Sequence, residues 1–349
     1  MNRKVKMINW GGLIPSNISF DEMIRIAKRI EQSGFSSFWY PDEKFFRDCY
    51  VALTLVAKET SKIRLGPCVT DPFSHHPMQT SVSIGSLAEA APNRVVLGIG
   101  AGGRGLREIG YQMEKPAVAI RESIEIIRKL LAGESVTYSG RTKSIDNLPL
   151  DFPTPYKIPI MIGTGHGPFI QRLAGEVADI VLLANLCSTE AIAKGLENVE
   201  KGAKKAGRSI SSLELIARVD VSVNADRKKA QSAVAPKIIS ALRSSYPGLE
   251  YLGILPDFDI PSRLIQVLQK KDHKTKKFYS DPQNSAPLIP ETLYENLAIA
   301  GTPSEVALKI REISSSKIFT EITIAVVPQQ GESLYQAYDD FIEKVMPLV

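Results

Sequence analysis

The chain has 349 residues, of which 44% are apolar and 23% are charged, as is usual for a globular enzyme. The formal net charge of +5 is small, and the basic residues lie among acidic ones, which argues against a nucleic-acid-binding surface. No apolar run reaches the roughly 20 residues of a membrane-spanning helix, and the start of the chain lacks the apolar core of a signal peptide. We therefore expect a cytoplasmic protein that acts on a small molecule, without membrane or nucleic-acid partners.

Short apolar runs alternate with longer stretches of helical period, which is typical of repeated strand–helix units. We expect strands at residues 5–10, 37–40, 63–69, 94–99, 158–162, 179–183, 213–223 and 321–327. We expect helices at residues 19–33, 50–60, 79–90, 117–131, 168–176, 189–206, 225–243, 304–314 and 334–345. Parallel strands with helical crossovers close naturally into a barrel, so the sequence predicts one α/β domain over residues 1–349, a (β/α)8 TIM barrel. A doubly wound open sheet is the competing architecture, but the Gly-x-Gly-x-x-Gly loop that it would serve is absent.

Two segments interrupt this alternation. Residues 134–157, after the fourth unit, are rich in Pro, Gly and Thr, and residues 244–297, after the seventh unit, are loop-rich and charged. Long insertions in a compact domain are often functional. We therefore expect these two excursions to roof the pocket and to set specificity.

Glycine-rich loops follow the fourth and fifth predicted strands, at the barrel end where TIM-barrel chemistry lies. The loop at 163–168 has three glycines within five residues and a proline at a helix start, which lets backbone N–H groups approach an anion, and Thr164 adds a hydroxyl donor. The loop at 100–105 adds a second glycine cluster with Arg104. A tight turn explains either loop alone, but together they favour a phosphorylated cofactor. The candidate cofactor-binding residues at these strand ends are Gly100, Ala101, Gly102, Gly103, Arg104, Gly163, Thr164, Gly165, His166, Gly167 and, after the sixth strand, Asn185.

Two carboxylates, Asp42 and Glu43, follow the second predicted strand and are the candidate catalytic residues. Asp42 is better placed to contact a ring or a substrate than to be an accidental surface charge. Glu43 could act as an acid or base if burial raises its pKa, or it could pair with Lys44 or Arg47 at the surface. Both interpretations of Glu43 stay open.

Other residues that invite a functional reading have simpler explanations. His75 and His76 are followed by no third ligand at metal spacing, so we expect loop residues near the cofactor mouth and no metal site. Cys68 has no adjacent basic partner and is expected to pack on a buried strand. Trp39 is expected in the core, while Trp10 could pack there or line the pocket.

Four motifs, in this order, resemble the bacterial-luciferase-like superfamily. They are IRLGPCVTDPFSHHP (63–77), NRVVLGIGAGG (93–103), IPIMIGTGHGP (158–168) and LAGEVADIVLLAN (173–185). The resemblance is greatest to the branch around the deazaflavin-dependent methylene-tetrahydromethanopterin reductases. It runs from the first strand to about Ser222, with a further fragment at GTPSEVALKI (301–310), and residues 244–297 lie outside it.

This resemblance implies a luciferase-like barrel that forms a homodimer or homotetramer and binds coenzyme F420, with FMN as the second choice. The flat ring would lie across a bulge in the third strand, beside Cys68, Val69, Thr70 and Asp71, and the Cys68–Val69 peptide bond would be cis. The cofactor phosphate would lie near Gly163–Gly167. The implied chemistry is hydride transfer at the ring, for which the protein supplies orientation and a dry pocket.

The sequence also departs from these relatives. Reductases of this branch commonly carry Asp-His after the second strand, where this chain has Asp42 and Glu43, and often an acidic residue at the end of the first strand, where it has Gly11 and Gly12. A methylene-tetrahydropterin is the nearest substrate by resemblance, and alcohols, sugar phosphates and aldehydes are alternatives. An FMN-dependent monooxygenase or reductase is the runner-up. The missing histidine motivates a non-enzymatic flavin-binding protein as the alternative of another class, while the paired glycine loops argue against a barrel without cofactor.

Overall fold

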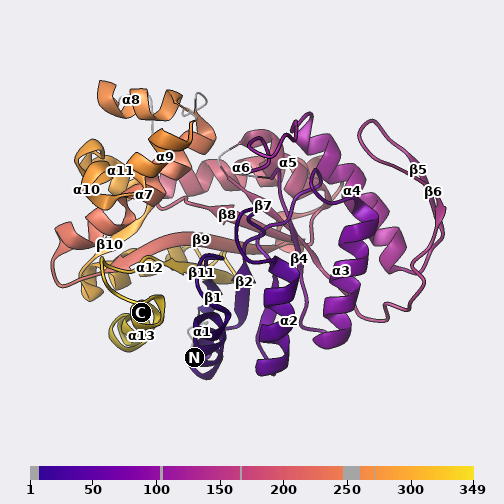
Figure 1. The fold of residues 1–349 in the computed structure, drawn as a ribbon, viewed down its shortest axis with the longest axis horizontal. Helices are drawn as coiled ribbons and strands as arrows, with labels where there is room; N and C mark the ends of the chain where they lie inside the picture. The colour runs from indigo at the N-terminus through magenta and orange to yellow at the C-terminus, as the bar shows by residue number, and fades with distance from the viewer. Residues whose placement is uncertain (1–7, 103–104, 166, 247–259, 271) are drawn as a thin grey trace.

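The computed structural model describes residues 8–102, 105–165, 167–246, 260–270 and 272–349. Within these residues, eight parallel strands run in the order β3-β2-β1-β11-β9-β8-β7-β4 (Figure 1). Parallel bridges join Leu65 to Val95 and Thr70 to Ile99, so the two edges of the sheet meet and the sheet closes. The predicted (β/α)8 barrel is confirmed. In chain order its strands are β1 (Asn9–Leu13), β2 (Ser37–Tyr40), β3 (Arg64–Pro67), β4 (Leu97–Ile99), β7 (Ile160–Thr164), β8 (Ile180–Ala184), β9 (Glu214–Val223) and β11 (Glu321–Val326).

Helices cover the outside of this barrel (Figure 1). They are α1 (Phe20–Gln32), α2 (Cys49–Glu59), α3 (Pro77–Ala90), α4 (Pro116–Leu131), α5 (Pro168–Val177), α6 (Thr189–Lys205), α7 (Arg227–Ser245), α12 (Pro303–Ser315) and α13 (Leu334–Lys344), with single 3-10 turns at Ile210–Ser212, Ala286–Leu288 and Met346–Leu348. Local signals set their ends: Ser19 caps α1 by accepting the N–H of Glu22, and Gly34 ends that helix with a φ of 84°. No helix among the described residues combines the length and the apolar character needed to cross a membrane.

Apolar side chains fill two layers. The inside of the barrel holds Trp39, Val96, Met161, Ile180, Leu182 and Ile216, and a larger cluster lies between the strands and the surrounding helices. Trp39 is fully buried, as expected of a core residue. Trp10 belongs to the outer layer, where its ring lies 6.4 Å from that of Phe35 and 5.6 Å from that of Phe341. Trp10 therefore packs in the core.

The first strand differs from the expectation at residues 5–10, because β1 covers Asn9–Leu13. Glycines 11 and 12 suggested the end of a strand, but each is needed inside it. A Cβ on Gly11 would lie 2.3 Å from an oxygen of Glu321, and one on Gly12 would lie 2.8 Å from Ile30. The strand accordingly ends at Leu13. Residues 5–7 of the expected strand lie outside the described residues.

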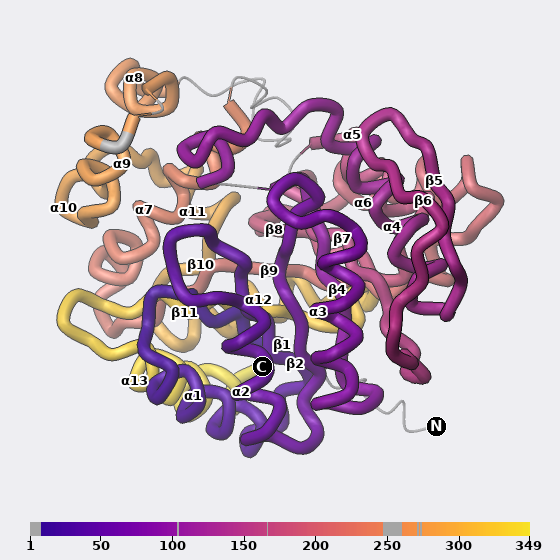
Figure 2. Tube along the Cα trace, turned by 45° about the vertical axis from the view of Figure 1, so that its right-hand side comes forward, coloured from indigo at the N-terminus to yellow at the C-terminus, as the bar shows by residue number. Residues whose placement is uncertain are grey.

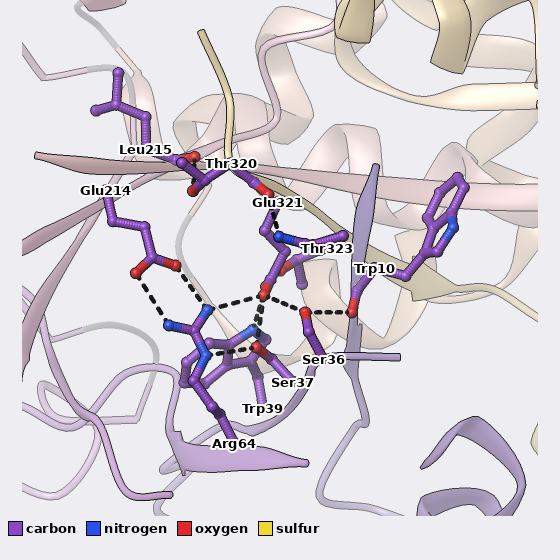
Figure 3. A network of polar contacts seen from close by, with 11 residues as sticks. Trp10, Ser36, Ser37, Trp39, Arg64, Glu214, Leu215, Thr320, Glu321 and Thr323 are labelled. Atoms are coloured by element: carbon purple, nitrogen blue, oxygen red, sulfur yellow. Dashed lines mark hydrogen bonds and ion pairs between the residues drawn. The ribbon is translucent and has the colours of Figure 1, made fainter. Parts of the chain in front are cut away.

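A buried carboxylate, Glu321, lies at the amino end of β11 and closes the floor of the barrel. Figure 3 shows the polar contacts that surround it. Glu321 is 1% exposed and accepts hydrogen bonds from the hydroxyls of Ser36, Ser37 and Thr323 and from the indole N–H of Trp39, at 2.5–3.0 Å. Arg64 also binds it at 3.1 Å and pairs with Glu214 through both terminal nitrogens. These donors satisfy the buried charge, as a dry interior requires.

The first excursion contains a β-hairpin, β5 (Val136–Ser139) and β6 (Ser144–Leu148). Val136 and Ile145 pack on Ile126 and Leu130 of α4, so the hairpin lies on the outside of the molecule, far from the cap described next (Figures 1 and 2). Glu122 of α4 accepts the N–H groups at 141–143 and holds the hairpin tip.

The second excursion forms a helical cap, which we define as α8 (Ser262–Gln269), α9 (His273–Tyr279), α10 (Pro282–Ser285) and α11 (Glu291–Leu297) (Figure 2). The expectation of a loop-rich segment is wrong for residues 262–297. The helices are short and separated by prolines and caps such as Asp272 and Asp281, so no helical period extends far enough to be visible in the sequence. Their apolar faces share a core with α7, and strand β10 (Ile299–Gly301) then pairs with β9.

Candidate active site

A cavity of about 570 Å³ opens at the carboxyl ends of the barrel strands. Its lining comes from the ends of β1, β7 and β8, from the loops after β3, β4 and β7, and from β9 and the end of α7. The lining residues are Leu13, Cys68, Val69, Ala101, Gly102, Gly163, Thr164, Gly165, Gly167, Ile170, Leu182, Ala184, Arg218, Ser244 and Ser245. The prediction that both glycine loops meet at one end of the barrel is confirmed.

The segment after β3 enters this cavity through the side chain of Val69. The Cys68–Val69 peptide bond is cis, as the resemblance implied. A Cβ on Gly100 or on Gly163 would lie 2.5 Å from a methyl group of Val69. These two glycines therefore let Val69 pack between the ends of β4 and β7. Val69 and Gly163 line the cavity, whereas Gly100 lies behind Val69 and is not part of the lining.

The loop after β7 supplies the open part of the wall. A Cβ on Gly165 or Gly167 would meet nothing within 4 Å, so backbone is exposed to the cavity at both positions, next to the first turn of α5. Thr164 lines the cavity too, but its hydroxyl donates to the carbonyl of Leu182 at 3.1 Å. The expectation that Thr164 offers a hydroxyl donor to an anion is therefore wrong. Three predicted residues, Gly103, Arg104 and His166, lie outside the described residues.

Asp42 lies in an ion-pair cluster beside the cavity and is not among the residues that line it. Its Oδ2 accepts from Thr70 Oγ1 at 2.7 Å and lies 2.9 Å from Lys44 Nζ and 3.2 Å from His75 Nε2. Lys44 also pairs with Asp71 at 3.0 Å, and Asp71 accepts the N–H groups of residues 73 and 74. Thr70 and Asp71 thus hold this cluster together and do not face the cavity.

The cluster keeps Asp42 ionised. Burial alone would raise the pKa of this carboxyl, but the contacts with His75, Lys44 and Thr70 outweigh it and lower the pKa to about 2. The pKa of Lys44 is raised despite its own burial, because it lies between two carboxylates. At neutral pH Asp42 is therefore an acceptor and an anchor for Lys44, and it carries no proton to donate.

Glu43 accepts a hydrogen bond from the hydroxyl of Ser16 and pairs with neither Lys44 nor Arg47. It is half-buried and, like Asp42, does not line the cavity.

The adjacent histidines, His75 and His76, have different contacts. His75 lies beside Asp42, whereas His76 caps α3 and contacts the carbonyl of Ser144 in the hairpin. Within the described part of the chain, no group of three or more His, Cys, Asp or Glu side chains is arranged to hold a metal ion.

The two excursions differ in their relation to the cavity. Residues 134–157 contribute nothing to its described lining, so the expectation that the first excursion roofs the pocket is wrong. The second excursion does reach it, because Ser244 and Ser245 line the cavity and Asp272, Lys276 and Tyr279 of the cap line an adjoining hollow that shares Gly102 and Ser244.

Arg218 is the functional candidate that sequence reasoning missed. It lies on β9 and points into the cavity, and it is the one charged side chain in the lining that the structure describes. Asn185, which has a φ of 58°, accepts a hydrogen bond from Arg218 Nη1, so this predicted cofactor-binding residue helps to hold the arginine. The alternation of β9 could have indicated that Arg218 shares a face with Ile216, but only a known barrel register shows that this face is the interior.

An eight-stranded barrel with a glycine-walled cavity at the carboxyl ends of its strands defines a TIM-barrel enzyme, since such enzymes work at that end. Residues 7–318 match the sequence profile of the family described as "Luciferase-like monooxygenase". The chain belongs to this family of oxidoreductases.

Individual relatives narrow the comparison. The chain is 33% identical over 332 residues to a 5,10-methylenetetrahydromethanopterin reductase of Archaeoglobus fulgidus. The aligned region is 94% of this chain and 97% of the relative. It is 29% identical over 225 residues, 60% of this chain and 66% of the relative, to an F420-dependent glucose-6-phosphate dehydrogenase of Microbacterium testaceum. Among solved structures, the coenzyme F420-dependent tetrahydromethanopterin reductase of Methanopyrus kandleri superimposes with a TM-score of 0.79 at 25% identity, over 97% of this chain and 99% of that one.

Proposed function

We propose that this protein is an F420-dependent reductase that transfers a hydride between the deazaflavin and a small organic substrate, with a methylene-tetrahydropterin as the substrate to test first. The observation that carries the proposal is the cavity itself, which combines backbone exposed at Gly165 and Gly167 with the wall formed by Val69. Full-length similarity to reductases of this kind supports the choice of cofactor and substrate.

The residues present fit such a cofactor. Backbone exposed at Gly165 and Gly167, beside the first turn of α5, suits a phosphate. Leu13, Ile170 and Leu182 would offer apolar surface to a flat ring, and Val69 would bound it on one side. When bound, the cofactor would supply the hydride chemistry. The chain would bind and orient the ring and exclude water.

The polar groups beside the cavity would serve the substrate. Asp42, ionised at neutral pH, is proposed to orient Lys44 and a substrate donor. Glu43, which accepts a hydrogen bond from Ser16, is the proposed acid or base. We also expect a homodimer or homotetramer, which light scattering coupled to size-exclusion chromatography measures directly.

The cofactor proposal is tested by titrating the purified protein with F420 and with FMN and following the ring fluorescence. We expect saturable binding of F420 at micromolar concentration and much weaker binding of FMN. Tight FMN binding without F420 binding would favour the luciferase-like monooxygenase alternative, which the family description itself supports.

The activity is tested separately, by following the 420 nm absorbance of F420 with methylene-tetrahydromethanopterin as the oxidant. Oxidation of reduced F420 that depends on this substrate is the expected result. Binding of F420 with no turnover on a panel of pterin, alcohol, aldehyde and sugar-phosphate substrates would instead identify a non-enzymatic binding protein.

A further inference from the structure

Arg218 lines the cavity, and part of its hydrogen-bonding capacity is unused within the described part of the chain. It lies on β9 above Ile216, which belongs to the barrel interior, and its side chain is 14% exposed. The neighbouring lining is apolar, from Leu182, Ala184 and Cys68. A guanidinium in such surroundings needs partners for its N–H groups, because buried donors are costly to leave unpaired.

Three of the five N–H groups of Arg218 have partners. Nη1 donates to the side-chain oxygen of Asn185 and to Asp220 Oδ2 at 3.1 Å. Nη2 donates to Asp220 Oδ1 at 2.6 Å. Asp220 thus accepts hydrogen bonds from both terminal nitrogens of the guanidinium, and Asn185 accepts the outer hydrogen of Nη1.

The remaining donors lie on one edge. Nε–H is buried and has no hydrogen-bond partner within the described part of the chain, and no contact there takes the second hydrogen of Nη2. In a planar guanidinium these two N–H bonds point the same way and form a fork. Such a fork binds two adjacent acceptors in one plane, as in a carboxylate or in the N–C=O edge of a pyrimidine-type ring.

We infer that the Nε/Nη2 fork of Arg218 binds the N1–C2=O edge of the cofactor ring and stabilises the negative charge that this edge gains on reduction. The inference rests on the proposed function. Arg218 and Val69 line the same cavity, so a flat ring that rests on Val69 would share that space with the guanidinium. A fixed cation at this edge favours the reduced ring over the oxidised one.

The inference is tested with Arg218→Gln and Arg218→Lys, and with Arg121→Gln as the control, since Arg121 pairs with Glu176 on the outside of the barrel. Dissociation constants are measured for oxidised and reduced F420, and the midpoint potential of the bound cofactor is measured by spectroelectrochemical titration. For Arg218→Gln we expect weaker binding of both forms, with at least a tenfold larger loss for the reduced form and a lower midpoint potential. Arg218→Lys keeps the charge without the fork, so it should weaken binding of the oxidised form while shifting the potential less.

The outcomes separate the possible failures. If Arg218→Gln is unstable in a thermal melt, Arg218→Gln/Asp220→Asn removes the whole ion pair and is measured instead. Unchanged affinity and potential in the Arg218 variants overturn the inference but leave the proposed function intact. A rise confined to the KM of the substrate also overturns it and assigns the fork to a substrate carboxylate. Absence of both F420 and FMN binding by the wild-type chain overturns both proposals.

Discussion

Glycines around the cavity have two different roles. Gly100 and Gly163 make room for Val69, whereas Gly165 and Gly167 face open space. The same residue type therefore serves packing at the strand ends and ligand access in the loop. Substitution by alanine distinguishes these roles, because only the first kind of glycine is needed by the protein without ligand.

Gly163→Ala should destabilise the protein by about 1–3 kcal/mol, because its Cβ would overlap a methyl group of Val69. Gly165→Ala should leave the free energy of unfolding unchanged within about 0.5 kcal/mol. The same Gly165 variant should bind F420 about tenfold more weakly, since the new methyl group occupies ligand space. Urea unfolding and fluorescence titration measure the two effects. Normal cofactor affinity in Gly165→Ala would place the ligand elsewhere.

The charge on Asp42 predicts a pH dependence of stability. Its folded pKa of about 2 lies below the usual 3.8, so the ionised form stabilises the folded state. This contribution, about 2–3 kcal/mol, is fully present above pH 4 and is lost as the pH falls from 4 towards 2. Asp42→Asn should therefore lose stability at pH 7 and show a flatter acid limb in urea unfolding between pH 5 and pH 2. Asp21→Asn, at an exposed position, is the control substitution. Equal acid limbs in the wild type, Asp42→Asn and Asp21→Asn would contradict the stabilising role of ionised Asp42.

At the scale of elements, the β5–β6 hairpin supports the loop after β3 from outside. Lys143 donates to the carbonyl of Pro72, and the Ser144 carbonyl contacts His76. The hairpin thus braces the segment that follows Val69, although it never touches the cavity. A structural insertion and a substrate-selecting one look alike in sequence, because both are polar and break the strand–helix alternation.

Glu122→Gln tests this brace. The Glu122 carboxylate accepts the N–H groups of Arg141, Thr142 and Lys143, and the amide nitrogen of glutamine cannot accept. We expect a loss of about 1–3 kcal/mol in stability and faster amide exchange at residues 141–143, with a smaller increase at 73–76. Hydrogen exchange by mass spectrometry compares this variant with exposed Glu134→Gln. Faster exchange at 141–143 without any change at 73–76 would show that the loop does not depend on the hairpin.

Prediction from sequence succeeded where one element depends on its own residues. The strand at 37–40 is the observed β2, and α1 lies within the helix expected at 19–33. Prediction from sequence failed where the role of a residue depends on a contact with a residue far away in the chain. Gly11 belongs inside β1 because Glu321 lies opposite, and the hydroxyl of Thr164 is taken by Leu182, neither of which a local pattern reveals.

On the scale of the whole molecule, stability and chemistry lie at opposite ends of the barrel. The floor holds Glu321 with Arg64 and Trp39, and the cavity lies at the carboxyl ends of the same strands. This separation is expected of TIM barrels, in which the carboxyl-terminal face carries the active site and the amino-terminal face contributes to stability.

Glu321→Ala should therefore destabilise the protein by about 3 kcal/mol, since it leaves buried donors unsatisfied and Arg64 with Glu214 alone. Cofactor affinity should change less than about twofold once the variant is folded. Thermal unfolding and fluorescence titration on the same samples measure both quantities, with the exposed substitution Glu343→Gln as reference. A large fall in affinity would mean that the floor controls the shape of the cavity.

The pairing of β10 with β9 has an evolutionary consequence. The chain leaves the barrel after Val223 and returns at Gly301, its register partner, where the N–H of Asn224 donates to the Gly301 carbonyl. The segment between these neighbours contains α7 and the cap, which share an apolar core, and its two ends are adjacent. A cap inserted between adjacent ends can be lengthened, shortened or exchanged among paralogues at little entropic penalty, so descendants of one scaffold can acquire new substrates without redesigning the barrel.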